Sequence, residues 1–189
     1  QRNKNVLIMG GGLGMGSIRQ SLVRLDKLDD VDSFTVVTGY NADLYDEIYQ
    51  LRRELRHPVK VLGYTNRIAE LMAKAALLVT KPGALTCTEA ATVQVPMVLY
   101  SPIPGQEEAN AMYMQEKGCA RWAKGQENLA VITADLLRHP EKLQAMSEAS
   151  VSCHRDGARI IATHIRQIVF PDDEESLSVC GSEYSHESI

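Results

Sequence analysis

The stretch NVLIMGGGLGMGSIRQSLVRL (residues 5–25) decides the fold class. It opens with five mostly aliphatic residues, which favour a strand that is buried on both faces. A loop dominated by glycine follows, and the run from Ser17 then places apolar residues at helical spacing, with Ser17 as the expected N-cap. A buried strand, a glycine turn and a helix in this order predict the first unit of a parallel sheet.

The same alternation continues along the chain. Further apolar runs predict strands at 33–38, 59–63, 75–80, 96–100 and 119–123. Amphipathic stretches predict helices at 17–25, 42–55, 65–75, 85–94, 107–118, 126–139, 140–150 and 154–169, the third capped by Thr65 and the fifth ended by Gly118. Strands that alternate with helices form βαβ units with right-handed crossovers. The sequence therefore predicts an α/β fold, a Rossmann-like doubly wound parallel sheet of about six strands.

The composition fits a soluble globular domain. The 189 residues are 44% hydrophobic and 23% charged, and the net charge of -4 offers no basic face to a nucleic acid. The cysteines form no CxxC pair and no histidine lies at zinc-ligand spacing, so we expect reduced thiols, no metal and no cofactor. No apolar run reaches the ~18 residues of a membrane span, and no secretory signal is present, which indicates a cytoplasmic protein.

The chain divides into two parts by composition. Residues 1–170 form the expected domain, whereas 171–189 are acidic, rich in serine and nearly free of aliphatic side chains, which predicts a disordered tail. The first residue is Gln1 rather than methionine, so we expect the chain to be a piece of a longer protein.

The glycine-rich loop predicts a phosphate site. Ligands of an open parallel sheet bind beyond the carboxyl ends of the strands, and there GGGLGMG (10–16) precedes a helix whose free N–H groups face the loop. The lysine of a P-loop is missing. The dinucleotide spacing GxGxxG fails at Met15 or at Ser17, and the second strand ends in Thr38-Gly39 without the acidic residue that holds a ribose. NAD binding is therefore disfavoured, although it stays an alternative.

Other loops at the same edge carry polar residues. Gly63 and Tyr64 follow the third strand, where a glycine either exposes backbone amides to a flat base or simply forms a turn. Lys81 follows the fourth strand and can neutralise phosphate charge. Glu89 lies on the next helix, where it either accepts two hydrogen bonds from a ribose diol or only stabilises the helix dipole.

A last polar group follows the fifth strand, after two prolines and a glycine. Gln106, Glu107 and Asn110 supply short polar donors and acceptors at the start of a helix. Such a group suits the hydroxyls of a sugar, although a capped and solvated helix start has the same composition.

Four segments in this order resemble those of a known family, namely GGGLGMG, GYTNRIAELMAKA, TKPGALTCTEA and PIPGQEEANAMYM, the last followed by KGCA. They are similar to the C-terminal domain of monogalactosyldiacylglycerol synthases and of bacterial processive diacylglycerol glucosyltransferases. A more distant similarity is to the MurG-type N-acetylglucosaminyl transferases. The resemblance covers about residues 5–150.

The resemblance implies the C-terminal half of a GT-B fold, in which two Rossmann-like halves face each other across a cleft and this half binds a UDP-sugar. The residues that match the family's motifs would contact the diphosphate (Gly11, Gly12, Gly14), the uracil through backbone atoms (Gly63, Tyr64), the phosphate and donor pocket (Lys81, Gly83, Ala84, Leu85, Thr86), the ribose (Glu89) and the donor sugar (Gln106, Glu107).

The implied activity is inverting transfer of a hexose from a UDP-hexose to a lipid hydroxyl such as that of diacylglycerol, as in galactolipid and other glycolipid synthesis. No metal is implied, because backbone amides, a helix dipole and a lysine can stabilise the leaving UDP. The full-length enzyme would work at the cytoplasmic face of a membrane, as a peripheral protein.

The family's N-terminal half supplies the acceptor site, the membrane-facing surface and the catalytic base, and these residues contain no counterpart of it. We therefore expect a fragment that binds UDP without turnover and whose base cannot be named. A UDP-sugar 2-epimerase, an NAD-binding module and a regulator that kept the nucleotide pocket are the alternatives.

Overall fold

The computed structural model describes residues 4–10, 17–153, 164–166 and 168–169. The chain separates into two compact units, Gln1–His154 and Arg155–Ile189, and the first contains the sheet. In the second unit, the described residues 164–166 and 168–169 are helical. The tail expected at 171–189 lies outside the described residues.

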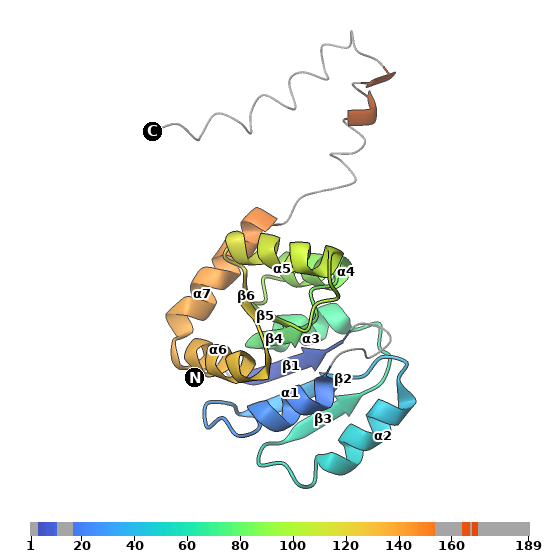
Figure 1. The fold of residues 1–189 in the computed structure, drawn as a ribbon, viewed down its shortest axis with the longest axis vertical. Helices are drawn as coiled ribbons and strands as arrows, with labels where there is room; N and C mark the ends of the chain where they lie inside the picture. Colours follow the sequence, from blue (N-terminus) through green and yellow to red (C-terminus); the bar gives the residue numbers. More distant parts are fainter. Residues whose placement is uncertain (1–3, 11–16, 154–163, 167, 170–189) are drawn as a thin grey trace. The chain divides into compact units, whose positions relative to one another are not determined.

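Six parallel strands form one sheet in the order β3-β2-β1-β4-β5-β6 (Figure 1). The strands are β1 (Asn5–Met9), β2 (Ser33–Val37), β3 (Val59–Leu62), β4 (Leu77–Thr80), β5 (Met97–Tyr100) and β6 (Ala120–Ala123). The chain builds outward from β1 to β3 and then returns to the other side of β1, so the order of the strands reverses between β1 and β4. The predicted doubly wound α/β fold is confirmed.

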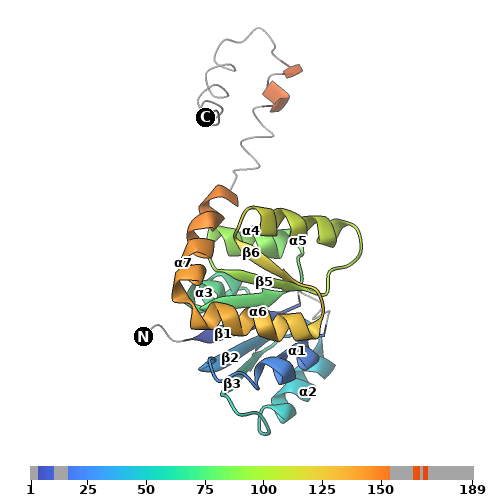
Figure 2. The same cartoon turned by 60° about the vertical axis from the view of Figure 1, so that its left-hand side comes forward.

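Helices cover both faces of this sheet (Figures 1 and 2). They are α1 (Ile18–Leu25), α2 (Ala42–Leu51), α3 (Ile68–Lys74), α4 (Ala84–Thr92), α5 (Gln106–Glu116), α6 (Gln126–Arg138) and α7 (Pro140–Ala149), followed by the 3-10 turn η1 (Ser150–Cys153). Successive strand residues point to opposite faces. Val6 and Ile8 therefore pack with α1, α2 and α6, whereas Leu7 and Met9 pack with α3, α4 and α5.

Helix ends differ from prediction where a distant side chain intervenes. Asp26, which follows α1, accepts hydrogen bonds from the backbone N–H groups of Arg56 and His57 at 2.9 and 3.0 Å. These bonds hold residues 56–57 outside the helix, and α2 ends at Leu51 rather than at 55, followed by turn bonds from Arg53 N to Gln50 O and from Glu54 N to Leu51 O. The predicted cap at Thr65 is also wrong: its hydroxyl accepts from the N–H of Arg67 within a turn, and α3 begins only afterwards.

The glycine that was expected to end the helix at 107–118 is confirmed. Gly118 has a φ of 80°, in the left-handed region that glycine adopts without strain, and it follows α5 directly after Lys117. Within the described ranges, no helix has both the length and the apolar character that a membrane span requires.

Candidate functional site

The carboxyl ends of the six parallel strands lie along one edge of the sheet, and the predicted site residues follow them. β1 and β4 are neighbours, with Met9 opposite Thr80, so the glycine-rich loop and Lys81 start side by side. Gly10 is buried at the beginning of that loop. The expected diphosphate residues that follow it lie outside the described residues, namely Gly11, Gly12 and Gly14.

The helix after the glycine-rich loop has no side-chain cap. Ser17 occupies the N-cap position of α1 as predicted, but its hydroxyl accepts a hydrogen bond from Gln126 Nε2 at 2.7 Å instead of bonding to the first turn. The first helical hydrogen bond runs from Ser21 N to Ser17 O, which leaves the amides of residues 18–20 outside the helical pattern. Open N–H groups at the positive end of a helix dipole suit an oxyanion.

Three side chains tie the loop after β4 to α5. Lys81 Nζ lies 3.3 Å from Glu107 Oε2, and the two side chains are only 9% and 18% exposed. Glu107 Oε2 also accepts a hydrogen bond from Ile103 N at 2.7 Å, and Asn110 Nδ2 donates to Pro82 O at 3.0 Å. The lysine predicted to neutralise phosphate and the glutamate predicted to bind sugar therefore meet, and they hold the loops after β4 and β5 together.

The start of α4 leaves space beside its backbone. Gly83, the N-cap, has φ -66° and ψ 136°, a conformation that any residue adopts, and a Cβ built on it would have no atom within 4 Å. Ala84 is exposed, Thr86 is half-buried, and Leu85 is 82% exposed. Neither backbone strain nor close packing requires a glycine at position 83, so the empty space beside Gly83 is available for a ligand.

Two of the predicted polar residues are open to solvent. Glu89 is exposed on α4, and in the part of the chain that the structure describes its carboxylate forms no hydrogen bond or ion pair. Gln106 is exposed at the first position of α5. Both side chains are therefore free to contact a ligand at the carboxyl edge.

The cysteines and acidic residues offer little chemistry. Cys87, Cys119 and Cys153 are free thiols, and burial, followed by the charge of Glu107, raises the pKa of Cys87 to about 12, which keeps it protonated. Among the residues that the structure describes, no group of three or more histidine, cysteine, aspartate or glutamate side chains could hold a metal.

Tyr64 has a partner that sequence reasoning missed. Tyr40, exposed after β2, stacks on Tyr64, exposed after β3, with ring centroids 4.3 Å apart and planes at 14°. Gly63 does not need its conformational freedom, because its φ is not positive. The sequence feature that indicates Tyr40 is the dipeptide Gly-Tyr, which follows both β2 and β3.

A hollow of about 530 Å³ at the same edge also went unpredicted. Its lining includes Ser17 and Gln20 from the start of α1, Ser101 after β5 and Trp122 of β6. Ser101 has a φ of 49°, which is uncommon for a residue with a side chain and is often found at functional sites. The hollow extends the candidate site from the carboxyl ends of β1 and β4 toward β6.

Tyr100 also lines this hollow and contributes a buried hydroxyl. The residue is 2% exposed. Burial raises the pKa of Tyr100 to about 12, against the opposing effect of the Ser21 hydroxyl, so the phenol stays a hydrogen-bond donor at neutral pH.

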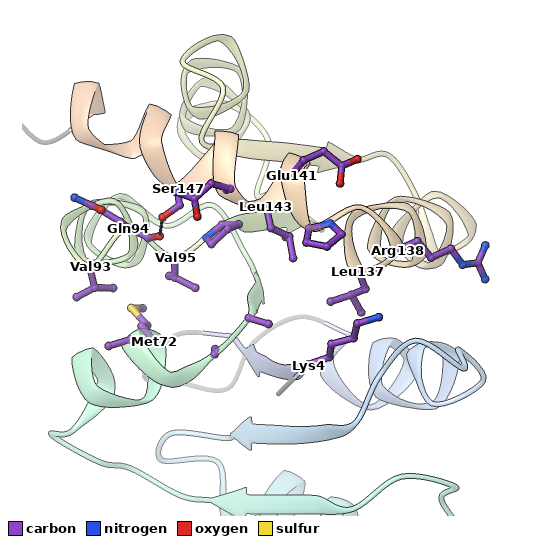
Figure 3. A pocket seen from close by; sticks show the side chains of 16 residues that line it. Lys4, Met72, Val93, Gln94, Val95, Leu137, Arg138, Glu141, Leu143 and Ser147 are labelled. Carbon is purple, nitrogen blue, oxygen red and sulfur yellow. Dashed lines mark hydrogen bonds between the residues drawn. The ribbon is translucent and has the colours of Figure 1, made fainter. Parts of the chain in front are cut away.

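A larger pocket, of about 760 Å³, lies at the opposite edge of the sheet (Figure 3). Lys4, Ala76 and Pro96 line it, and these residues directly precede β1, β4 and β5. Its walls are largely apolar, with Met72 and Leu143 among them (Figure 3). None of the predicted site residues lines this pocket, and parallel sheets bind ligands at the carboxyl edge. We therefore place the candidate site at the carboxyl edge, although its hollow is smaller.

Comparison with known proteins identifies the family of this chain. The model of the glycosyltransferase family 28 C-terminal domain matches residues 5–165. The processive diacylglycerol beta-glucosyltransferase of Bacillus mycoides is 37% identical over 156 residues, which cover 80% of this chain and 39% of the relative. The chain therefore spans well under half the length of this curated relative.

Solved structures share the fold at lower identity. MurG of Acinetobacter baumannii has a TM-score of 0.68 at 21% identity, over 86% of this chain and 52% of MurG. HepE of Anabaena, solved in complex with UDP-glucose, has a TM-score of 0.62 at 19% identity, over 80% of this chain and 43% of HepE.

Proposed function

Since this chain belongs to the glycosyltransferase family 28 C-terminal domain family, we propose that it is the donor-binding half of an inverting glycosyltransferase. That enzyme would transfer a hexose from a UDP-sugar to a lipid acceptor such as diacylglycerol. Two relatives at 37% and 36% identity are named processive diacylglycerol beta-glucosyltransferases, and HepE was solved with UDP-glucose. The observation that carries the proposal is the carboxyl edge of the sheet at β1 and β4, where Met9 lies opposite Thr80, so that the glycine-rich loop and Lys81, which pairs with Glu107, begin side by side.

The diphosphate of the donor would bind at the carboxyl ends of β1 and β4. Gly11, Gly12 and Gly14 of the loop, the open amides at the start of α1 and the ammonium of Lys81 would surround it. These groups stabilise the charge that grows on the β-phosphate as UDP leaves, which is the electrophilic contribution that this half makes to catalysis. Fixed amides and a fixed lysine do this without a metal ion.

The rest of the donor would extend along the same edge. Glu89 would accept hydrogen bonds from the ribose, because its carboxylate is exposed and uncommitted. The open side of Gly83, with Ala84, Leu85 and Thr86, would lie against the pyrophosphate and hexose. Gln106, Glu107 and Asn110 would meet the hexose hydroxyls, and Gly63 and Tyr64 would meet the uracil.

The acceptor and the base belong to another part of the enzyme in this proposal. The chain accounts for only 39% and 40% of the two diacylglycerol glucosyltransferases. The remaining length of such an enzyme would bind the lipid, contact the cytoplasmic face of the membrane and supply the general base. The domain would occupy residues 1–170.

Calorimetry on this chain tests the donor half of the proposal. We expect UDP and a UDP-hexose to bind, and Glu89→Gln to weaken both, whereas NAD should give no heat. Comparison of UDP-glucose with UDP-galactose then identifies the preferred donor. Absence of binding at millimolar UDP would remove the basis of the proposal.

Transfer itself requires the full-length protein that carries this domain. With diacylglycerol vesicles and a labelled UDP-hexose, the full-length protein should form a glycolipid, and this chain alone should form none. A full-length protein that instead converts the UDP-sugar into its epimer would favour the epimerase alternative.

A further inference from the structure

Two turns that carry the same dipeptide lie against each other at the ends of β2 and β3. Gly39-Tyr40 follows β2, and Gly63-Tyr64 follows β3. Thr38 donates to Leu62 O through its backbone N–H at 2.9 Å and its hydroxyl at 3.3 Å, so the strands stay paired up to the turns. A Cβ on Gly63 would lie 3.6 Å from Gly39 O, which is van der Waals contact. The pairing of β2 with β3 therefore brings the two tyrosines together.

The two rings form one flat aromatic surface in solvent. Their centroids are 4.3 Å apart and their planes meet at 14°, while Tyr40 and Tyr64 remain 67% and 61% exposed. A hydrogen bond to Tyr64, more than burial, raises the pKa of Tyr40, so its phenol is neutral at physiological pH. Exposed tyrosines that are fixed against each other keep an apolar face available at little cost in side-chain entropy.

A second tyrosine pair shows the contrast. Tyr45 and Tyr49 of α2 are half-buried, with centroids 5.8 Å apart, and the guanidinium of Arg52 lies 3.5 Å from the Tyr49 ring centre. That cation already covers the Tyr49 ring. No cation lies over Tyr40 or Tyr64 among the residues that the structure describes.

The platform lies at a suitable distance from the phosphate site. β2 is one strand from β1 and two strands from β4. At ~4.8 Å per strand, the strand before Tyr40 and the strand before Lys81 are therefore about 10 Å apart. A nucleoside diphosphate spans such a distance between its base and its terminal phosphate. Tyr40 follows a strand that is one position nearer to β1 and β4 than the strand before Tyr64.

We propose that Tyr40 and Tyr64 form a stacking platform for the nucleobase of the donor, with Tyr40 as the ring that the base contacts and Tyr64 as its support. This inference rests on the proposed function and adds a residue, Tyr40, and a side-chain role for Tyr64. The rings are too close for a base to enter between them, so the base stacks on the outer face of Tyr40. Every base has a π-face, and the platform therefore adds affinity without selecting uracil.

Calorimetry on this chain tests the platform with UDP, ADP and inorganic pyrophosphate as probes. Tyr40→Ala should weaken the binding of UDP about tenfold or more, because stacking of a base on an aromatic ring contributes that much to affinity. It should weaken ADP by a similar factor and leave pyrophosphate within about twofold of the parent chain. Tyr40→Phe should bind as the parent chain does, because it keeps the ring.

Matched variants separate stacking from general damage. Tyr49→Ala removes a stacked tyrosine of α2 and should leave UDP affinity unchanged. Tyr40→Leu keeps apolar bulk without a ring and should behave like Tyr40→Ala. Melting temperatures of all variants should stay close to that of the parent chain, because Tyr40 is largely exposed.

Three outcomes would overturn the inference. Unchanged UDP affinity in Tyr40→Ala removes the platform while the proposed function stands. If Tyr40→Ala loses affinity for UDP and for pyrophosphate by the same factor, Tyr40 maintains the shape of the site and does not contact the base. A parent chain that binds pyrophosphate but not UDP overturns the donor proposal and the platform together.

Discussion

Lys81 Nζ and Glu107 Oε2 lie 3.3 Å apart at a point where both side chains are nearly enclosed. The pair joins the end of β4 to the first turn of α5, and Ile103 N donates a hydrogen bond to the same carboxylate oxygen. A lysine held in this way is not a flexible surface charge. Its ammonium is already held beside Glu107 at the end of β4, so a ligand would not have to order it.

Removing one member of the Lys81–Glu107 pair should lower the free energy of unfolding. Lys81→Met leaves the Glu107 carboxylate enclosed without its cation, and we expect the free energy of unfolding to fall by about 2 kcal/mol, less than for a fully buried pair. Lys81→Met combined with Glu107→Gln should recover most of that loss, while UDP affinity stays low in both variants. Urea denaturation measures the stability of each, and a double variant as unstable as the single one would show that the pair is not coupled.

Glu89→Gln should separate binding from stability. The Glu89 side chain is exposed, and no described residue bonds to its carboxylate, so the melting temperature should not change. Loss of the charged acceptor for a ribose diol should weaken UDP about tenfold, because hydrogen bonds to charged groups are worth roughly 1.5–3 kcal/mol. Glu116→Gln, at the exposed end of α5, is the matched control. Equal affinities in calorimetry would assign Glu89 to the helix dipole instead.

Two glycines at the site should respond differently to alanine. Gly83 has ordinary dihedral angles and open space around its missing Cβ, so Gly83→Ala should be stable, or more stable by about 0.5 kcal/mol. Gly105 has a φ of 93°, so Gly105→Ala should destabilise by about 1–2 kcal/mol. If the donor approaches the Gly83 backbone, Gly83→Ala will nevertheless lose UDP affinity. Melting and calorimetry on the same samples test both statements, and a stable Gly83→Ala that binds UDP normally contradicts the second.

Acid should remove the contribution of Asp26 to the free energy of unfolding. Burial alone would raise the pKa of this carboxyl, but hydrogen bonds from Arg56 and His57 outweigh burial and hold the pKa below its usual value of 3.8. A folded pKa below the unfolded one stabilises the protein fully above pH 3.8, and this stabilisation is lost as the pH falls through the folded value. Asp26→Asn should lower the free energy of unfolding by about 1–3 kcal/mol at pH 7.

The difference between the parent chain and Asp26→Asn should therefore shrink as the pH falls below 3.8. Urea denaturation at pH 7, 5 and 3 follows this difference. A gap that stays constant over that range would show that the titration of Asp26 does not contribute.

The strands were predictable because a buried parallel strand is a short apolar run that needs no information from elsewhere. Each observed strand lies within its predicted range, although 75–80 shortens to Leu77–Thr80. Helix ends were less predictable, because they depend on partners that are distant in sequence. Asp26, at the end of α1, binds the backbone of Arg56 and His57 just beyond α2, and no local pattern around residues 52–55 indicates this contact.

The site was predictable as a set of loops but not as a set of contacts. Strand order alone places Lys81, Glu107 and Asn110 at one edge of the sheet. That Lys81 pairs with Glu107, and that Asn110 bonds to Pro82 O, depends on how α5 sits over the loop after β4. Tyr40 was missed for a similar reason, since its contact with Tyr64 exists only because β2 pairs with β3.

Trp122 is the only tryptophan in the chain, and it lines the hollow beyond β6, with Lys124 Nζ 4.8 Å from the ring centre. The sequence therefore carries a single tryptophan fluorophore, at one end of the candidate site. The tyrosine platform lies at the other end of the strand order, after β2 and β3. Selective excitation of Trp122 would therefore report events at the β6 end of the site without a label.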